Sequence, residues 1–446
     1  MANPSTVRPA GGPNYLVPFI TMVILMAMIG LITSINQQFQ VPIKGAFLSG
    51  AGAYQDTLAT LITFSFFLAY LVMGPISARY LDRNGYKRTI VFGLVILAVG
   101  LGVFEGSAWL FQATGGSAIQ FTDTVSIPVS YFIFLAGSYL CGTGLTYMQS
   151  SVNPYIVACS VRGTTGVQRQ NISGTANSTM TTLGPLFISY VVFSGAAADQ
   201  VSIRAIYLPM LILMMFILLL ALIVPRLDLP HIAGTTAGDN RHLPKSVWSF
   251  SHLTMGVIAL FVYVGVEVCV GSNINLYATS QLGMSAANAA TLASLYWLCM
   301  LIGRLISSFM SKVHARVLLA VSTAAAALLI ILFYVLSGQT FTLPLWGAGS
   351  VTISLKLLSL IAIGLFHSVM WGAIFALAID KLGIYTARAT GALVMGVFGG
   401  AILPVVQAFM ADSLGSWDWT WLLVLLGEAY MLFYALVGSR VRTPAE

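Results

Sequence analysis

Apolar runs of about 20 residues recur along the whole chain, and this feature limits its possible folds more than any other. A run of this length can cross the hydrocarbon core of a bilayer as an α-helix. Of the 446 residues, 58% are hydrophobic and only 7% are charged, whereas a soluble domain carries about a quarter charged residues. The chain cannot cover itself with a water-compatible surface. The sequence therefore predicts an all-α protein that crosses a membrane many times.

The hydropathy pattern predicts twelve transmembrane helices in two sets of six. They lie near residues 15–40, 55–80, 88–111, 126–159, 168–195, 203–225, 247–280, 286–311, 315–337, 350–380, 386–412 and 417–439. The stretch 226–246 is polar and contains Pro and Gly, which is typical of a linker. It separates a half at 15–225 from a half at 247–440. Residues 1–14 and 441–446 are predicted tails, and 1–14 lacks the apolar core of a removable signal peptide.

The distribution of basic residues predicts the orientation. If the two tails and the even-numbered loops lie on one side, only Lys44, Arg204 and Lys356 of the 20 Lys and Arg residues fall on the other. Cytoplasmic loops carry the excess of basic residues, so both termini are expected in the cytoplasm and the protein in a bacterial-type cytoplasmic (inner) membrane. Because the basic residues are scattered among short loops, the net charge of +7 gives no reason to expect a nucleic-acid partner.

The four cysteines lie inside predicted helices and form no CxxC motif. Such thiols usually pack as small apolar side chains, so neither a disulfide nor a metal site is expected. The chain has no Walker motif, and ATP hydrolysis is not expected of it. No enzymatic activity and no cofactor is predicted.

The two halves repeat a feature of sequence. "GPISARYLDRNGYKR" follows the second predicted helix and "GRLISSFMSKVHAR" follows the eighth. In each, a Gly is followed 13 places later by a basic residue, from Gly74 to Lys87 and from Gly303 to Arg316. Parallel repeats of this kind are typical of secondary transporters.

The loop "DRNGYKR" resembles a loop signature of the major facilitator superfamily. The resemblance implies the major facilitator fold, with two pseudo-symmetric six-helix halves. It also implies a gating role for Asp82, Arg83 and Arg88, whose charge-assisted hydrogen bonds across helix ends would stabilise one gating state. The chain departs from the signature at its leading glycine, Gly74, which lies eight residues before Asp82 rather than the usual four.

More narrowly, the whole chain resembles the fucose–galactose–glucose:proton symporter family, and most of all its glucose/galactose branch. Four stretches carry the resemblance: "NQQFQVPIKGAF", "QSSVNPY", "YVGVEVCVGSNINLYA" and "GLFHSVMWGAIFALAIDKLG". It implies a symporter that carries a neutral monosaccharide, a hexose, by alternating access and that works as a monomer in the lipid bilayer.

The chain departs from the family pattern at three places, and the first of them bears on the coupling ion. Where members carry an Asp in the first helix, this chain has Gln37 or Gln38. Gln149 replaces a Glu of the fucose branch, and Gly372 follows Trp371 where a Pro is usual. Proton coupling, sodium coupling and uniport therefore all remain open. A sugar sensor without transport and a drug exporter are alternatives from other classes.

Uncharged amides inside the predicted helices are the main candidates for binding a sugar. Polar side chains are costly in hydrocarbon, so those present usually face the bundle interior. Gln149 and Asn153 are four residues apart and share one face of a helix. Amides both donate and accept hydrogen bonds, as sugar hydroxyls do. Gln38 and Asn177 are further candidates. The alternative is that these amides bond only to neighbouring helices.

The second half supplies the remaining candidates. Glu267 is a carboxylate placed deep in a predicted helix, where it could accept bonds from a sugar, carry a coupling proton, or do both. His367 and Trp371 share one helical face, and the indole could stack on a pyranose ring. Glu428 is expected to be structural. The other candidates in this half are Asn273 and Asn275, with weaker support for Tyr296, Trp297 and Gln407.

Overall fold

The chain folds into a helical bundle, and we describe it from a computed structural model. The structure describes residues 15–441 except for 123–124, 160, 162–163, 165, 193–202, 228, 230–244, 309, 311–312, 337–338 and 346–348. The predicted linker 226–246 and the two predicted tails lie almost entirely outside these residues. The helices of the first part are α1 (Leu16–Gln38), α2 (Gln40–Phe47), α3 (Gln55–Ala113), α4 (Val129–Ala158), α5 (Gly166–Phe187) and α6 (Tyr207–Ile223). Those of the second part are α7 (Ser251–Gly271), α8 (Asn273–Leu276), α9 (Ala286–Ser308), α10 (Ala315–Val335), α11 (Leu355–Ala378), α12 (Thr386–Val394), α13 (Gly399–Leu414) and α14 (Trp421–Phe433).

Two short antiparallel hairpins were not predicted. β1 (Ala118–Thr122) pairs with β2 (Val125–Pro128), and β3 (Thr340–Leu345) pairs with β4 (Gly349–Ser354). The predicted helix starts at 126 and 350 are therefore wrong, because both positions lie in strands. In β2 and β4, which contain these two positions, Val and Ile alternate with Ser or Thr, a pattern that favours an extended chain over a helix.

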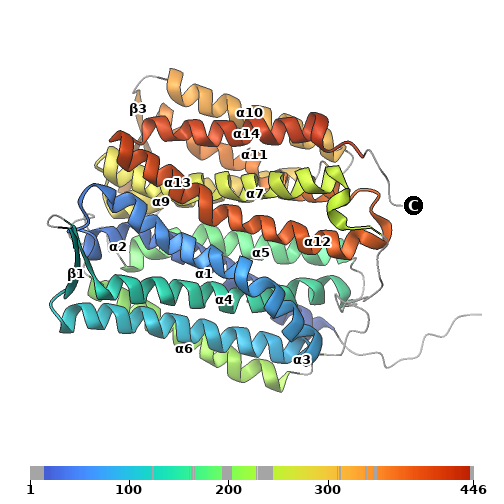
Figure 1. Cartoon of the computed structure of the whole chain (residues 1–446), viewed down its shortest axis with the longest axis horizontal. Coiled ribbons are helices and arrows are strands. Elements are labelled where there is room, and N and C mark those ends of the chain that lie inside the picture. The colour runs from blue at the N-terminus through green and yellow to red at the C-terminus, as the bar shows by residue number, and fades with distance from the viewer. Residues whose placement is uncertain are drawn as a thin grey trace, which may run out of the picture.

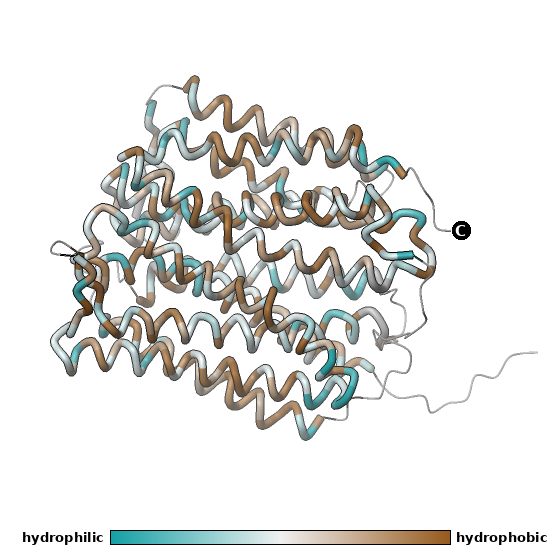
Figure 2. Tube along the Cα trace, viewed as in Figure 1, coloured by the Kyte–Doolittle hydropathy of each residue, from teal (hydrophilic) through white to brown (hydrophobic). Residues whose placement is uncertain are grey.

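The helices run roughly alongside one another, and both hairpins lie at one end of the bundle (Figure 1). We call this end the hairpin side; the opposite end, where the last described residues of the chain lie, is the terminal side. Figure 2 shows hydrophobic residues along the lengths of the helices and hydrophilic residues mainly near their ends. Among the described residues, 10 helical segments are long and apolar enough to cross a membrane.

The longest of these segments contains the two predicted helices 55–80 and 88–111. It runs over Gly52–Ala113, and its helix α3 is interrupted at Gly85, where φ is 73°. This backbone conformation is accessible to glycine at little cost. The chain reverses direction at this break on the terminal side (Figure 1). The second half has an interruption too, since α7 ends at Gly271 and α8 begins at Asn273.

The described residues before 227 and after 245 form two parts, which we call the first half and the second half. They occupy the lower and upper regions of Figure 1, and α5 packs against α9 and α3 against α13 between them. Within the second half, α7 and α13 approach closely: a Cβ on Gly399 would lie 1.8 Å from the carbonyl oxygen of Phe261.

Gly399→Ala is therefore expected to destabilise the protein by about 1–3 kcal/mol, the usual cost of overpacking a well-packed interior. Thermal unfolding of the detergent-solubilised protein measures this as a lower Tm. Gly391→Ala is the matched control, because its added Cβ would meet no atom of the described residues within 4 Å. It should leave the Tm unchanged or raise it, since alanine is the better helix former. Equal Tm values for the two variants would contradict the close approach of α7 and α13.

Candidate functional site

A cavity of ≈ 220 Å³ lies between the two halves. Its walls come from α1, α3, α4 and α5 of the first half and from α7, α9 and α11 of the second. Four of the main predicted site residues line it, namely Gln149, Asn177, Glu267 and Trp371, and so does Trp297, which had weaker support from the sequence. All four are half-buried, and they come from four different helices. The structure thus brings together the central part of the predicted site.

The two cavity amides are held by neighbours in the first half. Gln149 donates from Nε2 to the hydroxyl of Tyr70, at 3.1 Å, and Tyr70 also lines the cavity. Asn177 donates from Nδ2 to the carbonyl oxygen of Met26 on α1, at 2.8 Å. One end of each amide is thereby oriented, and the carboxamide oxygens can accept hydrogen bonds from a ligand.

Two further cavity side chains have buried polar atoms with unused hydrogen-bonding capacity. Among the described residues, neither the Oε1 atom of Gln37 nor the Nε1 atom of Trp297 has a hydrogen-bond partner. Leaving a buried polar group unpaired costs free energy, so each such group in a native structure calls for an explanation. Both side chains line the cavity, but these two atoms have almost no accessible surface, so a polar ligand would pair with them only after the side chains rotate.

The cavity also carries one charge of each sign. Glu267 on α7 and Arg304 on α9 both line it. Arg304 donates across the halves to the hydroxyl of Ser178 on α5. A guanidinium beside a carboxylate lowers the cost of keeping either charge out of bulk water. The cavity is therefore polar on both faces without a large net charge.

Aromatic side chains complete the second-half wall. The rings of Trp371 and Tyr263 meet edge to face, with centroids 6.4 Å apart and an interplanar angle of 61°. Both rings line the cavity, and Tyr263 is anchored by a 3.0 Å hydrogen bond from its hydroxyl to the carbonyl oxygen of His367. An indole packed in this way presents a rigid apolar surface inside a polar cavity.

The predicted residues Gln38, Asn273 and Asn275 do not line this cavity. They are buried on its hairpin side and join the two halves. Asn275 donates to the Oε1 atom of Gln38, and Asn273 accepts at Oδ1 from Gln40 Nε2 at 3.3 Å. Asn273 also donates to Gln407 Oε1, at 3.0 Å. In this structure these amides take the alternative role, bonding between helices.

Two other groups of predicted residues lie towards the terminal side. Asn153 accepts a 3.3 Å hydrogen bond from Gln170 and does not line the cavity. Asp82, Arg83 and Arg88 are exposed near the break in α3, and the neighbouring Lys87 donates to the carbonyl oxygen of Pro225 at 3.0 Å.

His367 is fully buried behind the cavity wall. Its Nε2 atom lies 2.6 Å from Oε1 of Glu428 on α14, and its Nδ1 atom lies 2.8 Å from the hydroxyl of Tyr296 on α9. His367 therefore belongs to a hydrogen-bonded row that is separate from the cavity lining.

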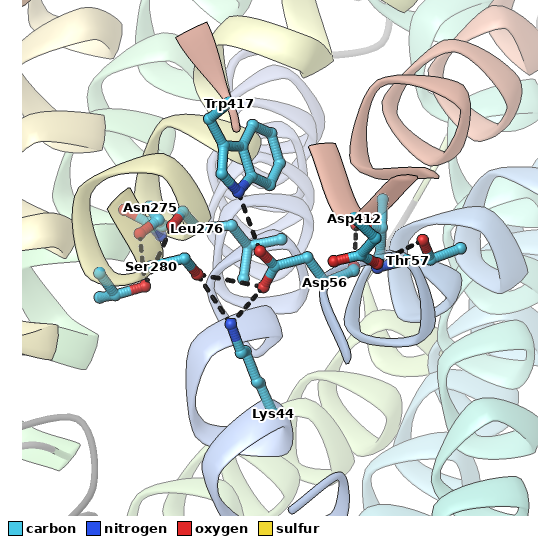
Figure 3. Close-up of polar contacts among 10 residues, drawn as sticks. Lys44, Asp56, Thr57, Asn275, Leu276, Ser280, Asp412 and Trp417 are labelled. Atoms are coloured by element: carbon cyan, nitrogen blue, oxygen red, sulfur yellow. Dashed lines mark hydrogen bonds and ion pairs between the residues drawn. The ribbon is translucent and has the colours of Figure 1, made fainter. Parts of the chain in front are cut away.

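A network of polar side chains closes the bundle between the cavity and the hairpin side (Figure 3). Asp56 at the start of α3 accepts from Lys44 Nζ at 2.5 Å, from Ser280 Oγ at 3.1 Å and from Trp417 Nε1 at 2.9 Å. Lys44 also donates to Ser280, at 2.8 Å. Because Ser280 and Trp417 belong to the second half, Asp56 ties the halves together.

A second contact beside it also joins the two halves. The carboxylate of Asp412, near the end of α13, accepts from both the backbone nitrogen and the hydroxyl of Thr57, at 2.7 and 2.6 Å. Charge-assisted hydrogen bonds of this kind are stronger than neutral ones. We call the contacts of Asp56 and Asp412 the hairpin-side seal.

Several of these residues were missed by reasoning from the sequence. Arg304 is not among the predicted site residues, although a basic residue within an apolar helix is itself a signal of a functional position. Lys44 carried such a signal too, as one of the few basic residues on its side of the membrane. The pairing of His367 with Glu428 had none, because the two are far apart in sequence.

The cavity can therefore hold a small neutral molecule that both donates and accepts hydrogen bonds and has an apolar face. A charged ligand would add a net charge to a cavity that Glu267 and Arg304 already line with one acidic and one basic group. Among the described residues, no group of three or more His, Cys, Asp and Glu side chains could hold a metal ion.

The chain is similar in sequence and in structure to known membrane transport proteins. The profile of the Major Facilitator Superfamily matches residues 15–403. A glucose/galactose transporter of Brucella abortus is 30% identical over 443 residues, covering 98% of each chain. The L-fucose-proton symporter of Escherichia coli is 24% identical, over 96% of this chain and 95% of the symporter. A crystal structure of the E. coli fucose:proton symporter superposes with a TM-score of 0.64 at 20% identity, covering 96% of this chain and all of that one.

Proposed function

The chain belongs to the major facilitator superfamily, in the family of the fucose, galactose and glucose symporters, and we propose that it carries a neutral hexose across the cytoplasmic membrane. The observation that carries the proposal is the cavity between the halves, which is lined by amides from the first half and an indole ring from the second. Hexoses offer hydroxyl groups that both donate and accept, together with apolar C–H faces. The relatives named as glucose/galactose transporters support the same substrate class.

Twelve transmembrane helices in two six-helix halves are part of this proposal. The break at Gly85 supports counting Gly52–Ala113 as two spans. α5 supplies a further one, and it is less apolar than the others because it carries cavity residues such as Asn177. The excess of Lys and Arg on the terminal side supports placing both termini in the cytoplasm. The hairpin side would then face outward.

The proposed mechanism is alternating access by a monomer. The hairpin-side seal supports it, because its hydrogen bonds cross from one half to the other beyond the cavity. Rocking the halves apart on this side would break these bonds and expose the cavity to the outside. Contacts such as that of Arg304 with Ser178 would break instead when the halves separate on the terminal side.

Proton coupling is the form of energy coupling that we propose, since carboxyl groups and a histidine lie within the second half beside the cavity. A specific observation favours the alternative of sodium coupling or uniport: Gln37 and Gln38 stand where members of this family carry an Asp. The two forms predict different responses to imposed gradients.

Counterflow in liposomes tests the substrate. Purified protein is reconstituted into vesicles loaded with an unlabelled hexose, and entry of trace labelled hexose is followed for glucose, galactose, fucose and amino sugars. Uptake above that of protein-free vesicles is expected for at least one neutral hexose. No counterflow for any sugar on the panel would refute the proposed function. Accumulation is then compared between an inward proton gradient and an inward sodium gradient.

A further inference from the structure

A carboxyl group and an imidazole are enclosed together between α11 and α14. The side chains of Glu428 and His367 are both 0% exposed, and their Oε1 and Nε2 atoms lie 2.6 Å apart. The other carboxyl oxygen of Glu428 has no hydrogen-bond partner among the described residues. A fully ionised carboxylate with one bare oxygen is costly in a low-dielectric interior. A proton on the pair removes most of that cost.

The other nitrogen of the ring is also engaged. Nδ1 of His367 lies 2.8 Å from the hydroxyl of Tyr296, which is itself fully buried. The row Tyr296, His367, Glu428 therefore has two arrangements. In one, the tyrosine hydroxyl donates to Nδ1 and Nε2 donates to the carboxylate. In the other, the protonated carboxyl group donates to Nε2 and Nδ1 donates to the tyrosine oxygen. A hydrogen-bonded row with two arrangements can accept or release one proton with little movement of heavy atoms.

The charges around the pair are balanced when the pair carries one proton. On the helices packed against it, Tyr263 and Glu267 of α7 and Tyr296 of α9 act on the pair, and Arg304 of α9 acts on Glu267. α10 also packs on α14, but its charged and titratable residues, Arg316 and Tyr334, are at its two ends. With both glutamates ionised and His367 neutral, the cluster has two negative charges and one positive charge. One proton on the pair makes it neutral.

Position distinguishes the two glutamates of this cluster. Glu267 lines the cavity together with Arg304, so its charge has both a counter-ion and access to a ligand. Glu428 has neither, since His367 is its hydrogen-bonded partner and the pair is sealed behind the wall that Tyr263 and Glu267 form. A buried ionisable residue in a membrane protein is by default a functional candidate, with its partner named.

We propose that the pair of His367 and Glu428 binds the coupling proton of transport. The inference rests on the proposed sugar transport and assigns its ion site. In the outward-open state the pair takes one proton from water; in the inward-open state it returns that proton to water. An O–H or N–H bond forms and later breaks, and no other reactant is needed. Glu267 then serves the sugar rather than the proton.

The test uses Glu428→Gln and His367→Gln in reconstituted full-length protein. Both variants are expected to keep hexose counterflow, which needs no net proton movement, and to lose accumulation driven by an inward proton gradient. Addition of sugar to wild-type vesicles should acidify their interior, as reported by a trapped pH-sensitive dye, and this signal should be absent in both variants. Asp380→Asn, the corresponding change at an exposed carboxyl just after α11, is the control and should behave as wild type.

A measurement without sugar keeps the two proposals separable. The infrared difference spectrum between acid and alkaline pH should contain a carboxyl signal in the wild type and in Asp380→Asn that is missing in Glu428→Gln. Absence of counterflow in the wild type would refute sugar transport and leave this signal as the test of the proton site. Full proton-driven accumulation by Glu428→Gln, or an unchanged infrared signal in it, would overturn the assignment. If Glu428→Gln does not yield folded protein, His367→Gln carries the same accumulation and dye predictions.

Discussion

Asp56→Ala is expected to open the hairpin side of the bundle. The substitution removes the acceptor of three hydrogen bonds, two of them from the second half, and leaves Lys44 without its partner carboxylate. The pair is only partly buried, with Lys44 24% exposed, so removing the acceptor costs about 1–3 kcal/mol. That cost falls on the closed state, and about 2 kcal/mol shifts a two-state equilibrium by roughly 30-fold. The population with an open hairpin side should rise accordingly.

A reporter cysteine measures the shift. Ser272 is buried behind the seal, and its hydroxyl donates to the carbonyl oxygen of Gln37 at 3.4 Å. Ser272→Cys, in a chain whose four native cysteines are replaced by alanine, should react with a membrane-impermeant maleimide added outside much faster when Asp56→Ala is also present. Transport should slow, because the cycle then rests in one state.

Asp418→Ala is the matched control for the seal. Asp418 forms an ion pair with Lys356 at 2.9 Å and accepts a hydrogen bond from Tyr277 at 3.1 Å, so its contacts lie within the second half. Its loss should leave the labelling of the reporter unchanged. Equal labelling in Asp56→Ala and Asp418→Ala would show that the contacts of Asp56 do not hold the halves together.

Glu267→Ala is expected to weaken sugar binding by about 10-fold to 100-fold, because a hydrogen bond to a charged group contributes roughly 1.5–3 kcal/mol. Arg304 would also lose the counter-ion with which it shares the cavity. The half-saturating sugar concentration in counterflow measures the effect. Glu105→Ala removes a carboxyl that lies outside the cavity lining and should leave that concentration unchanged.

The isosteric variant Glu267→Gln separates binding from coupling. It keeps a hydrogen-bond acceptor but removes the charge, so we expect weaker binding with proton-driven accumulation retained at saturating sugar. Loss of accumulation with unchanged affinity would instead assign the coupling proton to Glu267, the role for which the sequence first suggested it.

The parts of the site that could be predicted from the sequence share one physical basis. Gln149, Asn177, Glu267 and Trp371 are polar or amphipathic residues within apolar helices, and the cost of exposing polar groups to lipid directs them inward. Helical periodicity then assigns each to a face. Periodicity does not predict how deep along the helix the cavity lies: Asn153 shares the face of Gln149 but lies one turn beyond the cavity wall.

Contacts between distant helices could not be predicted. Gln38 and Asn275 have the composition of sugar ligands, yet their amides bond to each other because the halves meet there. Which partner a buried amide finds depends on the packing of whole helices, and the order of residues in one helix does not encode it. The same holds for Glu428, whose expected structural role gave no indication that His367 would be its partner.

Equilibrium binding of a labelled hexose to the purified wild type and to Gln149→Leu tests the central claim most directly, namely that the amides of the cavity hold a neutral sugar. Losing one amide that both donates and accepts should weaken binding by about tenfold or more, whereas Gln339→Leu, at an exposed position outside the cavity, should bind as the wild type does. Binding by Gln149→Leu with wild-type affinity, or no saturable hexose binding by the wild type, would contradict the account.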